Sequence, residues 1–238
     1  MKRTDIVMTE ELKSFLAFDL GHMKEDAFPN KRTDIPYCDD PELLLDIYPE
    51  EKKDTYPVFL IVFGGGWISG FRRSRFVEYM LKPLQMGYAC AVAQYTLSLD
   101  DTFPRPVIDL KKAVDYLHTH AQELLLDTDN LTLWGESAGG HLALETALLP
   151  NERLGLTGLN TEVKNLVIFY PATDCDTIDR YAKTEKDRHL RPDSVMGIFL
   201  SSGLNDPQTL DLASPAHWIH PGMPRLWLQH GTADRLVT

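Results

Sequence analysis

The sequence predicts an α/β fold, in which a mostly parallel β-sheet is covered by helices on both faces. Two observations support this prediction. From about residue 57 onward, short apolar runs alternate with segments of helical spacing, the order typical of parallel sheets. The early apolar runs are also continuous, as strands buried on both faces require. The 238 residues are 43% hydrophobic and 25% charged, and we assign them to one domain, residues 1–238.

The first elements follow from local patterns. Residues 42–48, ELLLDIY, are a short apolar run that ends at Pro49, so a strand is predicted. Residues 57–63, PVFLIVF, are apolar throughout and predict a strand buried on both faces. Between residues 74 and 86 the apolar residues have helical spacing, and Gly87 marks the end of the predicted helix.

The remaining elements follow the same two patterns, apolar runs for strands and helical spacing for helices. They are, in order, a strand at 88–95, a helix at 106–125, a strand at 131–134, a helix at 138–149, and strands at 165–171 and 224–231. Residues 174–215 interrupt the alternation because they are polar, with one short apolar run, VMGIFL. This segment is either a small cap over the site or a surface loop, and the sequence favours neither.

Charge and cysteine usage restrict the classes of partner. The net charge of -11 disfavours nucleic acids and anionic membranes, and no apolar run is long enough to span a bilayer. The N-terminus lacks the apolar core of a secretory signal. Cys38, Cys90 and Cys175 have no CxxC spacing, which argues against a zinc site or a disulfide framework. We therefore expect a cytoplasmic protein without metal or cofactor.

The stretch GESAG, residues 135–139, fits the pattern G-x-S-x-G between a predicted strand and a predicted helix. In that context the serine lies on a sharp turn, with its hydroxyl exposed at the helix N-terminus. Ser137 is the candidate nucleophile, and the Ala138 N–H points toward the oxygen of an attacked ester. The alternative is a serine that caps the helix.

Two further segments complete a candidate site. FGGGW, residues 63–67, follows a buried strand, and its glycines leave backbone N–H groups free to face an oxyanion. A flexible hairpin is the alternative, and a phosphate loop is disfavoured because no G-x-x-x-x-G-K-[ST] is present. Asp234 follows the last predicted strand, in the serine-then-acid order of α/β-hydrolases; taken by itself it reads as a turn aspartate.

Together these motifs resemble a known family. FGGGWISG, LWGESAGGHLAL, YPATD, SPAHWI and HGTADRLV are similar in order and spacing to α/β-hydrolase esterases of the hormone-sensitive-lipase-like and carbohydrate-esterase (BD-FAE-like) type. The resemblance covers residues 35–238. It implies the α/β-hydrolase fold, a small ester substrate, and a carboxylic-ester hydrolase acting on short acyl esters such as acetyl esters of carbohydrates. It implies Ser137 as nucleophile, Asp234 as acid, and oxyanion donors at Gly65, Gly66 and Ala138.

Two positions depart from the family pattern. Phe63 stands where the family usually has a histidine that organises the loop. In the family the catalytic histidine follows the acid, beyond one more strand, but no histidine follows Asp234 here. We therefore expect that the final strand and helix are missing and that this chain is a slow esterase. His217 and His220 are the alternative bases.

The other histidines are given structural roles. His141 resembles the packing histidine of the family's elbow helix, and His230 ends a predicted strand. The histidines outside every motif are interpreted as solvated surface residues: His22, His118, His120 and His189. Two other functions stay open, a non-catalytic binding module on a hydrolase scaffold and a peptidase or amidase on the same fold. The sequence does not indicate the oligomeric state.

Overall fold

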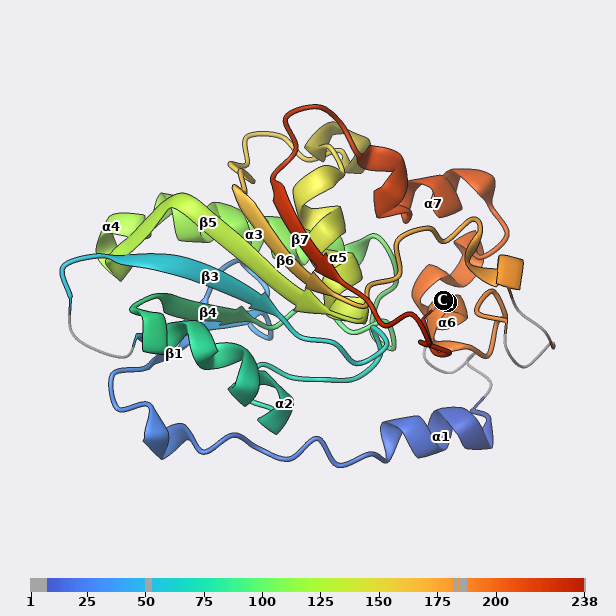
Figure 1. The fold of residues 1–238 in the computed structure, drawn as a ribbon, viewed down its shortest axis with the longest axis horizontal. Helices are drawn as coiled ribbons and strands as arrows, with labels where there is room; N and C mark the ends of the chain where they lie inside the picture. The colour runs from blue at the N-terminus through green and yellow to red at the C-terminus, as the bar shows by residue number, and fades with distance from the viewer. Residues whose placement is uncertain (1–7, 50–52, 182–183, 185–187, 238) are drawn as a thin grey trace.

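A computed structural model describes residues 8–49, 53–181, 184 and 188–237. Its centre is one seven-stranded sheet with the strand order β1-β2-β4-β3-β5-β6-β7 (Figure 1). Strands β3, β4, β5, β6 and β7 pair in parallel, whereas β2 pairs antiparallel with both β1 and β4. A mostly parallel sheet with helices on both faces confirms the predicted fold class.

The strands agree with the predicted apolar runs, with two differences. Their bounds are β1 (Arg32–Pro36), β2 (Leu44–Pro49), β3 (Tyr56–Val62), β4 (Ala89–Ala93), β5 (Leu126–Glu136), β6 (Asn165–Phe169) and β7 (Arg225–Gln229). β5 is longer than the predicted strand at 131–134 and begins in a polar stretch. β1 was not predicted, because RTDIP offers one aliphatic side chain at an edge of the sheet.

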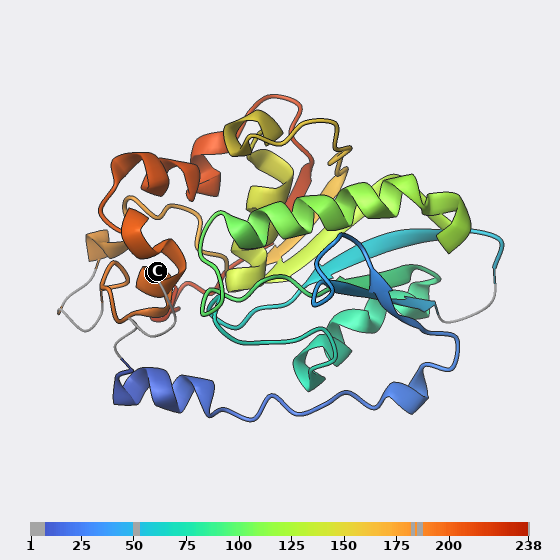
Figure 2. The same ribbon diagram turned by 180° about the vertical axis from the view of Figure 1, so that it is seen from behind.

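Helices cover the two faces of the sheet. On one face lie α3 (Arg105–Thr119) and α5 (Ala138–Leu148). This face is turned toward the viewer in Figure 2. α3 buries Leu110, Val114 and Leu117, the residues whose spacing predicted it.

None of the helices among the described residues is long and apolar enough to span a bilayer. The remaining elements before residue 172 are α1 (Glu10–Leu16), α2 (Arg75–Glu78), α4 (Ala121–Leu124) and three 3-10 helices, η2 (Glu25–Ala27), η3 (Tyr79–Met86) and η4 (Asn151–Leu154).

The helix predicted over residues 74–86 is only partly correct. The segment forms one α-helical turn, α2, followed by the 3-10 turns of η3. Pro83 lies inside η3 and has no N–H to donate, so an α-helix cannot continue through it. The buried residues of α2 and η3 are Val77, Met80, Leu81, Pro83 and Leu84, whereas Phe76 is 42% exposed rather than part of the core.

The polar segment 174–215 contains several short helices: η5 (Ile178–Tyr181), α6 (Val195–Leu200), η7 (Ser201–Gly203) and α7 (Pro207–Leu212), with η8 (Pro215–Trp218) at its end. It lies beyond the carboxyl ends of β3 and β5, in orange in Figure 1. Four residues of α6 are buried apolar side chains, Met196, Ile198, Phe199 and Leu200. Leu12 of α1 packs with Ile68 and Ile198 in a small cluster of its own.

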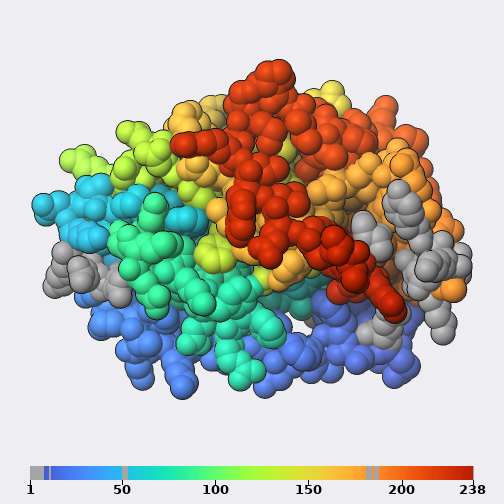
Figure 3. Space-filling view, in the orientation of Figure 1, coloured from blue at the N-terminus to red at the C-terminus, as the bar shows by residue number. Residues whose placement is uncertain are grey.

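Strand β7 forms one edge of the sheet, and all five of its residues are exposed. Leu226, Trp227 and Leu228 are 40%, 55% and 43% exposed. The segment that contains β7 is coloured red in Figure 3. Adjacent apolar side chains on an open sheet edge form a surface that apolar molecules can bind.

We expect the 238-residue chain to increase the fluorescence of the dye ANS in its folded state. The double variant Leu226→Lys/Leu228→Lys should lower the signal, because it places charge on the apolar edge. Met86→Lys is the matched control, since Met86 is 68% exposed but lies on η3. Equal dye binding by all three proteins would show that this edge is not the exposed apolar surface.

Candidate active site

Ser137 lies on a sharp turn between β5 and α5. Its backbone has φ 50° and ψ −127°, a conformation that non-glycine residues rarely adopt. The turn is held from both sides, because the Ser137 N–H donates to the Phe169 carbonyl at 2.9 Å and His141 N–H donates to the Ser137 carbonyl at 3.0 Å. The strand, strained serine and helix of the predicted elbow are therefore all present.

The two glycines of the motif allow the elbow to pack closely. A Cβ at Gly139 would lie 2.2 Å from the Val62 carbonyl oxygen, and a Cβ at Gly135 would lie 2.3 Å from the Gly139 carbonyl oxygen. No side chain fits at those distances. The absence of side chains lets α5 approach the end of β3, which brings Ser137 beside the glycine loop.

That loop, residues 64–67, directly follows β3. Gly65 and Gly66 have φ of 129° and 59°. The Gly65 carbonyl accepts from the Ile68 and Ser69 N–H groups, which turns it away from the site. In the described part of the chain, the N–H groups of Gly65, Gly66 and Ala138 have no hydrogen-bond acceptor. All three residues line one cavity with Ser137.

Phe63, at the position of the family's histidine, organises the loop by packing. Its ring stacks on Tyr95 with the ring centroids 4.5 Å apart, and the Tyr95 hydroxyl donates to the Phe63 carbonyl at 2.9 Å. At the other end of the loop, Trp67 stacks on Phe199 of α6 at 4.8 Å. Aromatic contacts thus hold both ends of the glycine loop.

His141 is a fully buried structural residue. Its Nδ1 accepts from the Trp67 indole N–H at 3.2 Å, so its Nε2 carries the proton and donates to the Ala213 carbonyl at 3.0 Å. Burial lowers the pKa of His141 to about 4, against the opposing effect of the bond to Ala213. Because both ring nitrogens are occupied, His141 is not available as a base for Ser137.

We expect His141 to make stability depend on pH between about 4 and 6.5. In that window the unfolded chain binds a proton that the native imidazole does not, so the stability present above pH 6.5 is lost as the pH falls. Each unit of pKa difference between the unfolded and native states corresponds to about 1.36 kcal/mol, so the free energy of unfolding falls by about 3 kcal/mol across this window. Urea titrations at several pH values measure it.

His141→Gln should flatten this dependence, whereas His118→Gln should keep it, because His118 is only half-buried and its ring bonds to the Glu162 carbonyl. An unchanged slope in His141→Gln would assign the dependence to other groups.

Asp234 lies in the turn after β7. Its Oδ1 accepts from the N–H groups of Leu236 and Val237 at 2.8 and 2.9 Å, and its Oδ2 is 3.4 Å from His230 Nε2. The hydrogen bond from the Val237 N–H is the main cause of the lowered pKa of the Asp234 carboxyl, which is therefore ionised at neutral pH. Leu236 and Val237 reach the cavity of Ser137, whereas Asp234 itself is not among the described lining residues.

The two alternative bases are not brought to Ser137. His217 Nδ1 contacts Asp211 Oδ1 at 2.9 Å, and the exposed His220 contacts the Pro221 carbonyl. Neither is among the described residues that line the cavity. His189 does line it and is half-buried, so the interpretation of His189 as a solvated surface residue is wrong. No motif surrounds His189, and only the folding of the 174–215 segment over the site reveals it.

The cavity beside Ser137 encloses about 230 Å³. Its walls come from α1, the glycine loop, the elbow, the segment after β6 and the end of the chain. The described lining residues are Phe15, Gly65, Gly66, Trp67, Ser137, Ala138, Ala172, Ile178, His189, Val195, Met196, Leu236 and Val237. Most of these side chains are apolar, so the cavity suits the short hydrocarbon part of a ligand.

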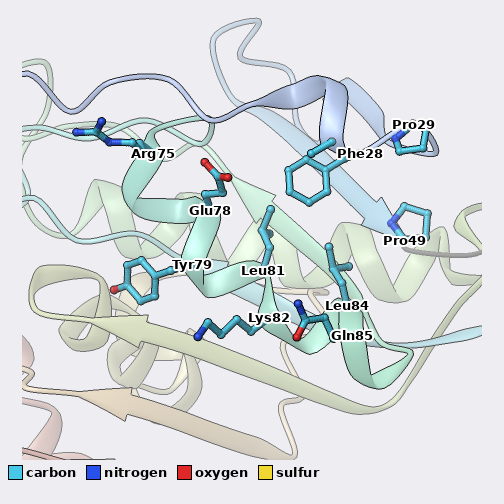
Figure 4. Close-up of a pocket in the computed structure, with 11 residues that line it drawn as sticks. Phe28, Pro29, Pro49, Arg75, Glu78, Tyr79, Leu81, Lys82, Leu84 and Gln85 are labelled. Carbon is cyan, nitrogen blue, oxygen red and sulfur yellow. The ribbon is translucent and has the colours of Figure 1, made fainter.

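A larger groove of about 490 Å³ lies elsewhere, between η2 and the turns of α2 and η3 (Figure 4). Arg75, Glu78 and Lys82 line it, but none of its described lining residues is a serine, cysteine or histidine. Tyr79 connects the groove to the elbow, because its hydroxyl donates to Glu136. Tyr170 donates to the same carboxylate, whose pKa is raised by burial. We assign no catalytic chemistry to this groove.

Comparison with known proteins identifies the family. The BD-FAE family model matches residues 45–238, most of the chain. The chain belongs to the BD-FAE family. This BD-FAE chain is 28% identical over 204 residues to the probable carboxylic ester hydrolase LipM and 27% identical over 214 residues to esterase LipQ, both of Mycobacterium tuberculosis. These matches cover 81% and 86% of the chain but 45% and 49% of the relatives, so the chain spans about half their length.

Solved structures share the fold of this BD-FAE chain. A truncated carbohydrate esterase from gut microbiota superposes with a TM-score of 0.77 at 21% identity, over 91% of this chain and 81% of that one. The butyrate-bound esterase Est2 of Thermogutta terrifontis has a TM-score of 0.67 at 25% identity, over 88% and 75% of the two chains. The α/β-hydrolase fold expected from the motifs is thereby confirmed.

Proposed function

We propose that this BD-FAE protein is a serine carboxylic-ester hydrolase with Ser137 as its nucleophile. The observation that carries the proposal is that Gly65, Gly66 and Ala138, whose backbone N–H groups have no acceptor among the described residues, line the same cavity as Ser137. Such donors stabilise the oxyanion of a tetrahedral intermediate, which forms in acyl transfer. The names of LipM and LipQ as ester hydrolases support the same activity.

In the proposed reaction, Ser137 Oγ attacks the acyl carbon of the ester. The negative charge that develops on the carbonyl oxygen is bound by the three N–H groups, and the position of Ala138 at the start of α5 adds the helix dipole. A general base takes the serine proton and transfers it to the leaving alcohol; the family pattern gives this role to an imidazole oriented by the acid, here Asp234, and no histidine of the described residues occupies that place beside Ser137. Water then hydrolyses the acyl-enzyme by the same route.

The cavity supports a small substrate. Its volume of about 230 Å³ and its apolar walls fit a short acyl or alcohol group. We propose short acyl esters as substrates, including acetyl esters of carbohydrates, because the truncated esterase that superposes with a TM-score of 0.77 is a carbohydrate esterase.

We also propose that residues 174–215 act as a small cap, since Ile178, Val195 and Met196 line the cavity. The free thiols Cys38, Cys90 and Cys175 support a cytoplasmic location.

Covalent capture tests the nucleophile directly. We expect a p-nitrophenyl phosphonate to add one phosphonyl group per chain, located on Ser137 by peptide mass spectrometry, because the reagent mimics the tetrahedral intermediate. Ser137→Ala should lose this adduct, and Ser69→Ala should keep it, since Ser69 lies near the loop but bonds to the Gly65 carbonyl. An adduct that persists in Ser137→Ala would refute the proposed nucleophile.

A further inference from the structure

His189 is the one unexpected polar group in the cavity of Ser137. Among the described lining residues, only Ser137, His189 and Trp67 have side chains that can form hydrogen bonds. The Trp67 indole N–H is already bound to His141 at 3.2 Å. The remaining described walls are glycine, alanine, aliphatic, methionine and phenylalanine residues. A ligand that fills this cavity therefore meets one available side-chain partner besides the candidate nucleophile.

The backbone around His189 is fixed by neighbouring side chains. The carboxylate of Asp179 accepts from the N–H groups of His189 and Leu190, at 2.5 and 3.1 Å. The His189 carbonyl accepts from the hydroxyl of Ser194, which also caps α6 by accepting from the Gly197 N–H at 2.9 Å. The segment that carries the imidazole is thus tied to η5 and α6, two elements of the cavity wall.

The ring of His189 is half-buried, and in the described part of the chain its nitrogens have no hydrogen-bond partner. Burial is the main cause that lowers its pKa; Asp179 opposes the shift and Arg191 adds to it. The ring is therefore neutral at neutral pH and offers one donor and one acceptor. A ligand that supplies a hydrogen-bond partner to such a partly buried polar group lowers the free energy of the complex.

We propose that His189 is a specificity residue, which binds a hydroxyl or second carbonyl oxygen on the part of the ester that fills the cavity. The preferred substrates are then short esters whose cavity-filling group carries one such oxygen, rather than purely hydrocarbon esters. This inference rests on the proposed function, because it assigns the substrate class of the same cavity. His189 acts on the substituent and not on the reacting carbonyl.

Binding of unreactive amides tests the inference without hydrolysis. The ligands are butyramide and its 2-, 3- and 4-hydroxy derivatives, titrated with the chain and detected by the NMR signals of the ligands themselves. We expect at least one hydroxy derivative to bind about 3- to 10-fold more tightly than butyramide, the gain from one neutral hydrogen bond. His189→Phe, which keeps a ring without nitrogen, should abolish this preference and leave butyramide binding nearly unchanged.

Two further variants make the test specific. His189→Asn or His189→Gln should recover part of the preference, because the amide replaces one ring nitrogen as a hydrogen-bonding group. His217→Phe should retain all of it, since His217 contacts Asp211 outside the cavity. Circular dichroism confirms that each variant is folded.

Three results would overturn the inference: an equal preference in wild type and His189→Phe, no preference in wild type, or no binding of any amide. Loss of phosphonate capture at Ser137 in His189→Phe would also overturn it, because the ring would then act on the reacting atoms. Failure of the proposed function looks different. In that case wild type gives no Ser137 adduct, whereas the His189-dependent binding preference persists.

Discussion

Replacing Gly139 with alanine is expected to lower the free energy of unfolding by about 3–5 kcal/mol, the range of severe packing defects. The added Cβ would lie 2.2 Å from the Val62 carbonyl oxygen and 2.4 Å from that of Phe63. Both obstacles are backbone atoms at the end of a central strand, so they cannot move aside as a side chain would. The elbow must therefore shift or α5 must separate from β3.

Thermal and urea unfolding measure this effect. For a chain of this length, about 3–5 kcal/mol corresponds to a fall in Tm of roughly 10 °C. Gly231→Ala is the matched control, because a Cβ there meets no atom within 4 Å and its backbone is not left-handed. Similar stability of the two variants would contradict the close approach of α5 to β3.

Replacing Gly65 with alanine is expected to slow acylation of Ser137 by about 100- to 1,000-fold, as loss of an oxyanion donor does. Gly65 has φ 129°, which a residue with a Cβ avoids, and its Cβ would lie 2.2 Å from the Ser69 carbonyl oxygen. The loop must change its conformation, which moves the Gly65 and Gly66 N–H groups. Because these groups act on the transition state, the effect should appear in kcat more than in KM.

Gly66→Ala provides the contrast. Its Cβ would lie 3.2 Å from Phe15 Cζ and 3.3 Å from Val195 Cγ1, both side-chain atoms that can move slightly, although its φ of 59° also strains the backbone of a residue with a Cβ. This variant narrows the cavity, so its KM for butyryl esters should rise more than that of Gly65→Ala. Acylation rates with p-nitrophenyl esters measure both variants. A Gly65→Ala effect confined to KM would mean that the loop binds substrate and does not form the oxyanion hole.

The sequence predicted the central sheet because its strands are defined by local patterns. A strand buried on both faces, such as β3, must be continuously apolar, and this can be read from seven residues. The elbow was also predictable, since G-x-S-x-G states a local steric requirement. The edge strand β1 was missed because a half-exposed strand needs few apolar residues.

Features that depend on contacts between distant segments could not be predicted in this way. The helix α1 has a recognisable start, as Thr9 accepts from the Leu12 N–H at 3.2 Å, but its burial depends on Ile68 and Ile198. The place of His189 in the cavity likewise depends on how residues 174–215 fold. The candidate catalytic residues were therefore predictable from motifs, whereas the walls that decide substrate preference were not.

The small cluster of Leu12, Ile68 and Ile198 fastens α1, which forms part of the cavity wall, to the rest of the molecule. It is separate from the main core, and the partly buried Val195, which packs against both, connects them. A region with few buried contacts needs little free energy to open while the rest of the molecule stays folded. Amide hydrogen exchange in α1 should therefore proceed through local opening, faster than in α3 and α5, whereas α6 is held in the main core by Met196, Phe199 and Leu200. Such opening removes Phe15 of α1 from the wall of the Ser137 cavity, and in the proposed esterase it would provide a route for substrate entry and product release that leaves the sheet intact.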